Sequence, residues 1–304
     1  MSRGGFTDPT DFWRKLPVVF DGGISSELYN RGCPFEEPPE LWAADNPKIV
    51  EELHADYCRA GATVATTATF GLMRRAYAGE IDVSRAADVV RAVVTACRNG
   101  VKAVNPSTLI GGSIGATARL PQEIEESRLR AAVEPMIDGM TTCGVSFILL
   151  ETQSSLRETI ALVSAVRQLS DLPMVISFAF AWHGRTLDDF TPGQAVEETL
   201  RYQPVAYGCN CAPDAVGMVR ILQQMAPVAD DIPVLLRPNA GIPRLVNGQQ
   251  VYSISPDRLA DLAGTYWLDG ARLFGGCCGT TPEHIAAVTA RLSYRTLPTE
   301  SDET

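Results

Sequence analysis

Residues Phe147–Thr152 read Phe-Ile-Leu-Leu-Glu-Thr, an unbroken apolar run that ends in an acid and a threonine. A short continuous apolar run is typical of a strand in a parallel sheet that is covered on both faces. The next segment, Ser155–Leu169, has the periodicity of a helix. Together the two segments predict one strand–helix unit of an α/β protein.

Units of the same kind extend in both directions along the chain. The other predicted strands are Val18–Asp21, Thr63–Ala68, Leu109–Gly115, Pro173–Phe178, Val205–Asn210, Pro233–Pro238 and Ala271–Gly275. The other predicted helices are Pro47–Ala60, Val83–Ala103, Gln122–Cys143, Thr191–Tyr202, Asp214–Met225, Pro256–Tyr266 and a last one that opens at Thr281-Pro282-Glu283. Eight strands, each followed by a helix, predict a (β/α)8 TIM barrel. The alternative, a doubly wound open sheet, usually has a G-x-G-x-x-G turn after its first strand, and Asp21–Ser25 lacks that spacing.

The composition is that of an ordinary globular chain with a large core. The sequence has 304 residues, of which 45% are hydrophobic and 20% charged. No Pro- or Ser-rich linker divides it, and α/β barrels often run to about 250 residues as one unit. We therefore expect a single barrel domain over residues 1–304, with a core from about 18 to 290 and a polar tail at 294–304.

Charge and hydropathy argue against several classes of protein. The formal net charge of -10 disfavours nucleic acid as a partner, because phosphate contacts need clustered Lys and Arg. No apolar run is long enough to cross a bilayer, and the first residues lack the apolar stretch of a signal peptide. We expect a cytoplasmic protein with reduced cysteines and no membrane partner. The sequence does not indicate its oligomeric state.

Four of the eight cysteines are grouped in two motifs, Gly208-Cys209-Asn210-Cys211 and Gly275-Gly276-Cys277-Cys278-Gly279. Each motif ends a predicted strand, and the ends of strands six and eight meet at one mouth of a barrel. One Cys of the first motif and both of the second would make a three-thiolate site, which leaves a tetrahedral zinc one open position. Strand alternation points Cys209 and Cys211 the same way, so Cys211 is preferred only as nearer the mouth. Close packing and a vicinal disulfide are the alternatives.

These motifs, in their order along the chain, resemble the homocysteine S-methyltransferase family. The resemblance runs from about Val18 to Ala290 and also includes Asp21-Gly22-Gly23, His54-x-x-Tyr57-x-x-Ala60-Gly61-Ala62, Gly112-Ser113-Ile114-Gly115, Glu151-Thr152 and Thr280-Thr281-Pro282. The double-Cys and Asn-Cys motifs together are highly specific. The family is a zinc-dependent barrel, and the resemblance implies that Cys211, Cys277 and Cys278 bind the zinc.

The resemblance also implies that Asp21 and Glu151 bind the amino group of homocysteine. An ammonium donates three hydrogen bonds, which two carboxylates and a carbonyl would satisfy. Gly22 and Gly23 would leave backbone N–H groups open to a carboxylate. The alternative is that Asp21 only caps the turn after its strand and that Glu151 pairs with a nearby Arg.

Three segments depart from the usual family pattern. Ala68 stands where Asn is frequent, Ala116 follows Gly115 where Pro is frequent, and Arg237-Pro238-Asn239-Ala240-Gly241 replaces Tyr-Pro-Asn-Ser-Gly. We expect Arg237 and Asn239 to contact substrate, with the planar fork of Arg237 pairing with a donor carboxylate. Alternatively, Arg237 is turned away and bonded to a neighbouring acid.

The predicted activity is zinc-dependent transfer of a methyl group from a cationic donor, S-methylmethionine or S-adenosylmethionine, to the thiolate of L-homocysteine. The product would be methionine, and no catalytic group is expected beyond the zinc-activated thiolate. Betaine ranks third, because the altered segments supply no aromatic wall for its trimethylammonium group. The alternatives are another thiol acceptor, betaine as the donor, or a non-catalytic zinc- or thiol-binding barrel.

Overall fold

The computed structural model describes residues 13, 17–212, 215–246 and 249–293. Eight parallel strands form one sheet in the order β1-β10-β7-β6-β5-β4-β3-β2. Their bounds are β1 Val18–Val19, β2 Val64–Thr66, β3 Leu109–Ile114, β4 Phe147–Gln153, β5 Met174–Phe178, β6 Ala206–Asn210, β7 Val234–Arg237 and β10 Leu273–Phe274. A parallel bridge between Phe20 and Val64 joins the first strand to the second, so the sheet closes into a barrel.

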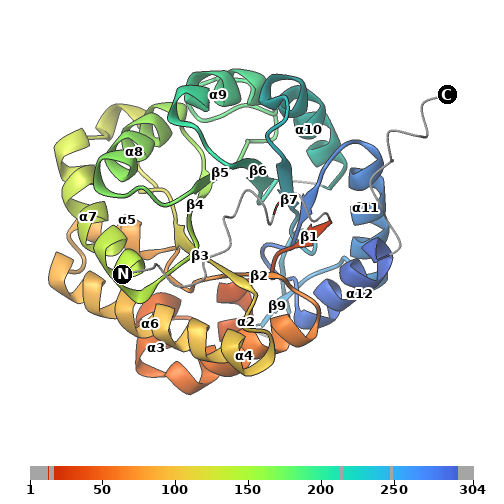
Figure 1. Ribbon diagram of the computed structural model, residues 1–304, viewed down its shortest axis with the longest axis horizontal. Helices are drawn as coiled ribbons and strands as arrows, with labels where there is room; N and C mark the ends of the chain where they lie inside the picture. Colours follow the sequence, from red (N-terminus) through yellow and green to blue (C-terminus); the bar gives the residue numbers. More distant parts are fainter. Residues whose placement is uncertain (1–12, 14–16, 213–214, 247–248, 294–304) are drawn as a thin grey trace, which may run out of the picture.

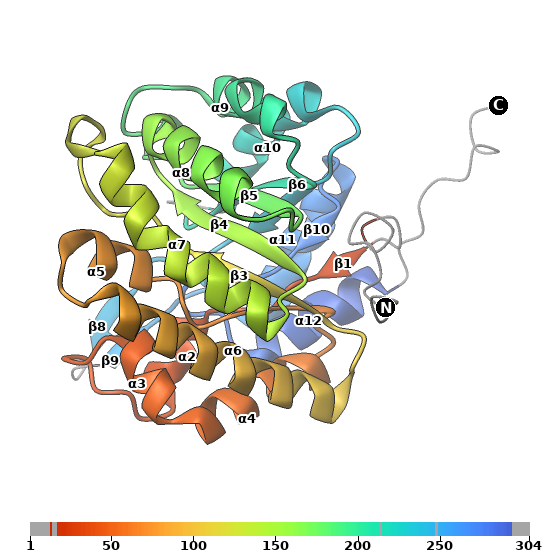
Figure 2. The same ribbon diagram turned by 60° about the vertical axis from the view of Figure 1, so that its left-hand side comes forward.

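Helices surround this barrel, as the view along its axis shows (Figure 1). Their bounds are α2 Ile24–Asn30, α3 Pro39–Asp45, α4 Pro47–Arg59, α5 Leu72–Ala78, α6 Val83–Val104, α7 Glu126–Cys143, α8 Leu156–Leu169, α9 Pro192–Thr199, α10 Ala215–Ala229, α11 Pro256–Leu268 and α12 Pro282–Leu292. In the turned view α6, α7 and α8 lie side by side along the outside of the sheet (Figure 2). The chain is therefore a (β/α)8 barrel, and the predicted fold class is confirmed.

Two apolar regions hold the barrel together. The larger lies between the sheet and the surrounding helices and is rich in Val, Leu and Ile. The smaller lies inside the barrel, where Trp13 stacks on Phe20 at 5.8 Å and Phe147 packs edge-on against Phe20 at 6.2 Å between ring centroids. Such aromatic pairs bury large apolar areas with defined geometry, so they fill the barrel interior as a packed core.

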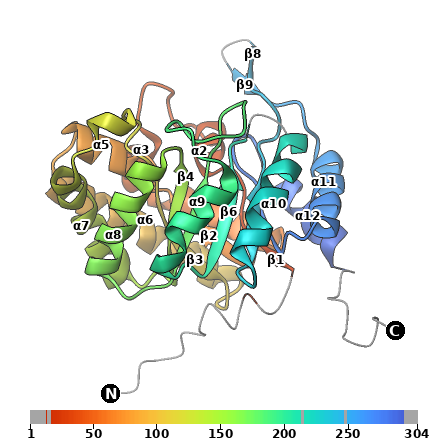
Figure 3. The ribbon, with the colours of Figure 1, turned by 90° about the horizontal axis from the view of Figure 1, so that it is seen from above.

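The carboxyl ends of the strands form one mouth of the barrel. Above it stands a two-stranded antiparallel hairpin, β8 Arg244–Val246 and β9 Gln249–Val251, in the connection between β7 and α11 (Figure 3). The same side carries the loop after β1 that leads into α2. Because catalytic residues of α/β barrels come from the carboxyl ends of several strands, this mouth is the place to look for the site.

The structure contains all eight predicted strands, each within a few residues of its predicted range. It adds three short helices, α2, α3 and α5, and the β8–β9 hairpin, which the sequence reading did not anticipate. These pieces have seven residues or fewer each, too short for a hydrophobic period to be recognised. No helix among the described residues has the length and apolar character that crossing a membrane requires. The predicted polar tail at 294–304 lies outside the described residues.

Candidate active site

Three cysteine sulfurs converge at the mouth of the barrel. The Cys211 Sγ lies 2.9 Å from the Cys277 Sγ and 3.8 Å from the Cys278 Sγ, and the last two are 4.0 Å apart. Thiolate ligands of a tetrahedral zinc, each about 2.3 Å from the ion, lie about 3.8 Å from one another. The three sulfurs therefore fit a single metal ion, with small adjustments of the closest pair.

The end of β6 separates the roles of its two cysteines. Cys209 is fully buried within the strand and belongs to the apolar core between sheet and helices. The strand ends at Asn210, and Cys211 adopts a positive φ of 53°. This left-handed backbone breaks the strand alternation, so the expectation that Cys209 and Cys211 point the same way is wrong. Only Cys211 joins the sulfur cluster.

The adjacent pair Cys277 and Cys278 lies in a tight turn after β10. A Cβ added to Gly276 would collide with the side chain of Thr280, and Gly279 has a φ of 76°. Both positions therefore require glycine, which permits left-handed backbone and close approach at no steric cost. The turn is held from the β7 side, because the Cys277 N–H donates to the Pro238 carbonyl at 2.8 Å.

Asn239 holds the same turn rather than lining the cavity at the mouth. The Cys278 N–H donates to its Oδ1 at 3.1 Å, and the next residue, Ala240, donates its N–H to the Cys278 carbonyl at 2.9 Å. The residues around the cavity do not include Asn239. Its contacts make it a residue that positions Cys278.

Hydrogen bonds within the cluster distribute the protons of the three thiols unequally. Donation from Cys211 and Cys277 lowers the pKa of the Cys278 thiol, the exposed member. Hydrogen bonds to Cys277 and to Cys278, together with burial, raise the pKa of the Cys211 thiol. Because a metal ligand must be a thiolate, one of the three sulfurs is already favoured in that form before the others lose their protons.

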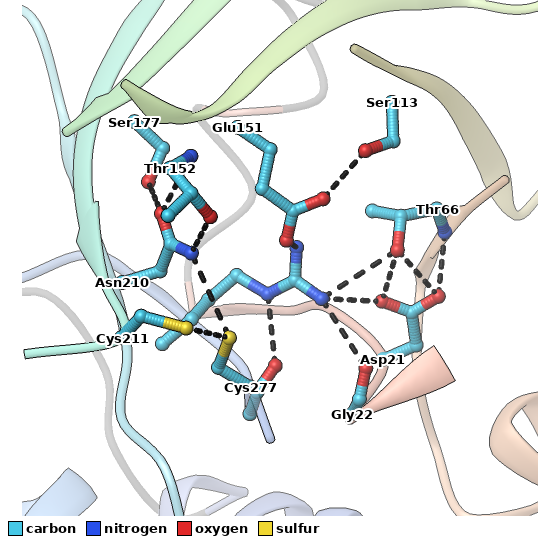
Figure 4. Close-up of polar contacts among 12 residues, drawn as sticks. Asp21, Gly22, Thr66, Ser113, Glu151, Thr152, Ser177, Asn210, Cys211 and Cys277 are labelled. Atoms are coloured by element: carbon cyan, nitrogen blue, oxygen red, sulfur yellow. Dashed lines mark hydrogen bonds and ion pairs between the residues drawn. The ribbon is translucent and has the colours of Figure 1, made fainter. Parts of the chain in front are cut away.

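Arg237 bonds to both acids that the sequence singled out, Asp21 and Glu151. Figure 4 labels these two acids and their other partners, Thr66 and Ser113. Its Nη1 donates to the Glu151 Oε1 at 2.9 Å and its Nη2 to the Asp21 Oδ1 at 3.1 Å. Its Nε donates to the Gly276 carbonyl at 3.0 Å and its Nη2 also to the Gly22 carbonyl at 3.3 Å. The guanidinium thus joins β7 to the ends of β1 and β4 and to the turn that carries the cysteines.

Both acids have further partners on the side away from Arg237. The Asp21 Oδ2 accepts from the Thr66 N–H at 2.5 Å, and the Thr66 hydroxyl donates to the Asp21 carboxylate. The Ser113 hydroxyl donates to the Glu151 Oε2 at 2.5 Å. The side chain of Arg237 is 2% exposed and that of Asp21 0%. The acids and Arg237 therefore form a buried ion-pair group.

Burial sets the protonation of this group. Desolvation raises the pKa of Asp21 from 3.8 to about 7, although the charge of Arg237 and hydrogen bonds from Thr66 oppose the shift. Burial also raises the pKa of Glu151, again against Arg237. The two carboxylates raise the pKa of Arg237 in spite of its burial. The arginine is therefore the fixed charge of the group, and Asp21 titrates near neutral pH.

A second polar group links the cysteines to β4 and β5. Asn210 is fully buried, and its Nδ2 donates to the Thr152 hydroxyl at 2.6 Å and lies 3.6 Å from the Cys277 Sγ. Its Oδ1 accepts from the Ser177 hydroxyl at 2.7 Å and from the Thr152 N–H at 3.1 Å. Asn210 therefore orients one metal-ligating sulfur by fixed bonds to two neighbouring strands.

The sulfur cluster and the ion-pair group border one cavity of about 230 Å³. Its charged lining side chains, apart from the cysteines, are Glu151 and Arg237, and Asp21 is not among the lining residues. Of the altered positions, Ala68 lines the cavity and Ala116 does not. Phe70 also lines it and is 36% exposed, so an aromatic face is present where the sequence reading expected none.

Several expectations from sequence change with these contacts. The Gly23 N–H donates to the Thr280 carbonyl at 3.0 Å, so it is not open to a carboxylate as expected. Gly22 lines the cavity, and its carbonyl accepts from Arg237. Arg237 faces the two acids, which is the arrangement named as the alternative to pairing with a donor.

Sequence reasoning gave no role to four polar residues that support the site, Thr66, Ser113, Thr152 and Ser177, although two of them, Ser113 and Thr152, lie in the motifs that carry the resemblance. All four are Ser or Thr within or at the end of strands, which is a common composition for a strand. Asn210 had a usable signal, since it lies between Cys209 and Cys211 in the motif that was singled out. Phe70 follows strand β2 directly at the mouth and could have been considered on that ground.

Comparison with known proteins agrees with this geometry. The chain is 28% identical to the homocysteine S-methyltransferase of Escherichia coli strain K12, over 90% of this chain and 94% of that protein. It is 31% identical to the methionine synthase of Mycobacterium leprae, over 96% of this chain but only 26% of that longer protein. The crystal structure of the homocysteine methyltransferase MmuM from Escherichia coli, apo form, superposes with a TM-score of 0.74 at 26% identity, covering 91% and 97% of the two chains.

A family model places these similarities on nearly the whole chain. The model of the homocysteine S-methyltransferase family matches residues 18–292, from the first strand of the barrel to its last helix. The match includes both acids, Arg237 and all three clustered cysteines. The chain therefore belongs to the homocysteine S-methyltransferase family and is a methyltransferase enzyme.

Proposed function

We propose that the chain transfers a methyl group from a cationic donor to the thiolate of L-homocysteine, giving methionine, at a zinc ion held by Cys211, Cys277 and Cys278. The observation that carries the proposal is the convergence of these three sulfurs on one border of the cavity at the barrel mouth. Three protein ligands leave a tetrahedral zinc one open position for a substrate, as in catalytic sites.

The three cysteine ligands suit the chemistry of a thiol substrate. When bound, zinc would keep the acceptor thiol as its thiolate at neutral pH. Thiolates are the soft ligands that zinc accepts readily, and three of them leave a net charge of minus one at the site. That charge keeps a bound thiolate nucleophilic.

The same negative charge favours a positively charged donor. In the transfer, the bond between the donor's onium atom and the methyl carbon breaks as the bond between the acceptor sulfur and that carbon forms. The donor leaves as a neutral thioether if it is a sulfonium, so its positive charge disappears in the transition state. Phe70 gives the cavity an aromatic face, and a cation over such a face is attracted by the ring.

S-methylmethionine and S-adenosylmethionine are the proposed donors, because both are sulfonium compounds. A pairing of Arg237 with a donor carboxylate no longer supports ranking one of these two donors above the other. The hydrogen bonds of Arg237 go to Asp21, Glu151 and two backbone carbonyls instead. The aromatic face of Phe70 also removes the reason for placing betaine last. The charge of the site and the presence of Phe70 support a cationic donor, but they do not rank the three candidates.

Among the proposed acceptor-binding residues, the contacts suggest different tasks. Gly22, Glu151 and Arg237 border the cavity, where they can face the polar groups of the acceptor. Asp21 is bonded to Arg237 and Thr66 and would act through them. Asn239 would position Cys278 by accepting a hydrogen bond from its backbone N–H.

The test is a donor screen on zinc-loaded protein of measured metal content. Homocysteine is incubated separately with S-methylmethionine, S-adenosylmethionine and betaine, and methionine is detected by mass spectrometry. We expect methionine with at least one sulfonium donor and none in a Cys277→Ala variant. Bound zinc without methionine from any of the three donors would support the non-catalytic barrel instead.

A further inference from the structure

Cys278 is the first member of a chain of hydrogen bonds that leads to helix α12. Its carbonyl accepts from the Ala240 N–H at 2.9 Å, and the Ala240 carbonyl accepts from the Ile254 N–H at 2.8 Å. The Ile254 carbonyl in turn lies 2.9 Å from the His284 Nε2, in the first turn of α12. The turn after β10, the connection after β7 and the segment before α11 are thus joined backbone to backbone, and a side chain of α12 continues the chain.

The two partners of His284 determine which tautomer its ring adopts. The Thr281 backbone N–H lies 3.2 Å from the Nδ1, and because an N–H group can only donate, Nδ1 is the acceptor. The Ile254 carbonyl can only accept, so Nε2 carries the proton and donates it. A neutral ring with its proton on Nε2 therefore satisfies both partners at once. His284 is 8% exposed, which leaves the ring little room to turn toward others.

These bonds close a ring at the turn that carries Cys278. The chain itself leads from Cys278 to Thr281, and the hydrogen bonds lead back through His284, Ile254 and Ala240. His284 supplies the side-chain link, and the other links are covalent or run from backbone to backbone. Loss of this one side chain therefore opens the ring without changing any of the clustered cysteines.

The segment before α11 also packs directly on the same turn. A Cβ added to Gly279 would lie 2.2 Å from the Tyr252 Cγ, so the aromatic ring of Tyr252 lies against the backbone of the turn. Of the three clustered cysteines, Cys278 is the exposed one. The segment 252–254 therefore supports the sulfur ligand that is most open to solvent.

We propose that His284 is a positioning residue of the metal site, which holds Cys278 in place for the ion through Ile254 and Ala240. Residues that orient a metal ligand commonly change metal affinity about 10–100-fold when they are replaced. His284 acts on the backbone of the ligand, so its replacement lowers the affinity for zinc while all three sulfurs remain. This inference deepens the proposed function and rests on the zinc site named there.

Two amide variants separate the two bonds of His284. His284→Gln can place an amide N–H near the former Nε2 and so keep the bond to Ile254. His284→Asn can place an oxygen near the former Nδ1, so it keeps the bond from Thr281 and loses the link to Ile254. Zinc affinity is measured by chelator competition on each protein. We expect the zinc dissociation constant to rise about tenfold or more in His284→Asn and to stay within about threefold of the wild type in His284→Gln.

The free energy of unfolding of the metal-free proteins identifies a merely structural role. A His284→Asn protein that is less stable but binds zinc like the wild type would overturn the proposal. Equal weakening of zinc in both variants would also overturn it, because the bond to Ile254 would then make no difference. A wild type that binds no zinc would contradict the proposed function itself, and the inference with it.

Hydrogen exchange in the wild type tests the ring without relying on the folding of a variant. Because coupling between two equilibria is reciprocal, zinc must stabilise the ring if the ring favours zinc. The amides of Ile254 and Ala240 should therefore exchange about tenfold or more slowly once zinc is bound. The Ser146 amide, which donates to a carbonyl of β3 at the opposite end of the barrel, is the control and should change less. Equal slowing at all three amides, or no slowing at Ile254, would overturn the proposal.

Discussion

The two sides of the cavity use their polar atoms in opposite ways. On one side, Cys211, Cys277 and Cys278 place three sulfurs around a common point, and Cys278 is exposed. On the other side, Asp21, Glu151 and Arg237 satisfy one another and are almost completely buried.

The difference shows which side can bind and which side supports. The three thiols contact one another, and the Asn210 amide approaches the Cys277 sulfur, which leaves their lone pairs available to a metal ion. Carboxylates that already accept from a guanidinium and from hydroxyl groups have fewer free acceptor sites for a ligand, although Glu151 still borders the cavity. We therefore assign metal and thiol binding to the cysteine side, and the shape and charge of the cavity to the arginine side.

The largest expected effect is the loss of zinc when one of the clustered cysteines is replaced. Cys277→Ala removes one of three ligands, so the protein should lose its zinc, from about one ion per chain to nearly none, and its turnover. Metal analysis after gel filtration measures this directly. Cys209→Ala is the matched control, because Cys209 is a buried core residue outside the cluster, and it should retain the metal. Equal zinc in both variants would contradict the assignment.

On the arginine side, Arg237→Met should destabilise the fold. It leaves the buried acids Asp21 and Glu151 without their cation, and breaking a buried ion pair costs about 3–5 kcal/mol. The free energy of unfolding, from urea titration, measures the loss. Arg291→Met is the control, since its pair with Asp261 is half exposed and should change the stability by less than about 1 kcal/mol. A similar loss in both variants would mean that Arg237 is not the support we describe.

The support that β4 and β5 give to the cysteine side is tested at Asn210. Asn210→Ala removes the amide that bonds to Thr152 and Ser177 and approaches the Cys277 sulfur. Replacing such a partner of a metal ligand commonly lowers metal affinity or activity about 10–100-fold. Zinc affinity by chelator competition measures it. Ser177→Ala removes one bond of Asn210 and should have a smaller effect. A zinc affinity equal to the wild type in Asn210→Ala would refute the link.

The smallest effect concerns the pH dependence of stability. Because the folded-state pKa of Asp21 is raised to about 7 from 3.8, the folded protein holds this proton more tightly than the unfolded chain. The contribution is fully present below the unfolded pKa and is lost as pH rises through the folded one, with a slope of at most about 1.4 kcal/mol per pH unit. Glu151 contributes with the same sign.

Urea titrations between pH 5 and 8 follow this dependence. The free energy of unfolding should fall with rising pH in the wild type and fall less steeply in Asp21→Asn. An identical pH dependence in the two proteins would show that Asp21 does not titrate in this range.

Much of the site was accessible to sequence reasoning because its residues end strands. Cys211, Cys277, Asp21 and Glu151 each follow a recognisable apolar run, and in a barrel all such ends meet at one mouth. The partners of Arg237 were not accessible in the same way. Arg237 bonds to Asp21, 216 residues earlier in the chain, and to Glu151, 86 residues earlier, so only the closure of the barrel brings these side chains together.

The sequence by itself determined the alternation of strands and helices, the grouping of the cysteines and the family, because these follow from local periodicity and short motifs. The tertiary structure decided which way side chains point at the mouth. The left-handed backbone at Cys211 separates it from Cys209, and burial directs Arg237 to the two acids. Local patterns do not determine such choices, because a buried charge takes whichever partners the fold brings within hydrogen-bonding distance.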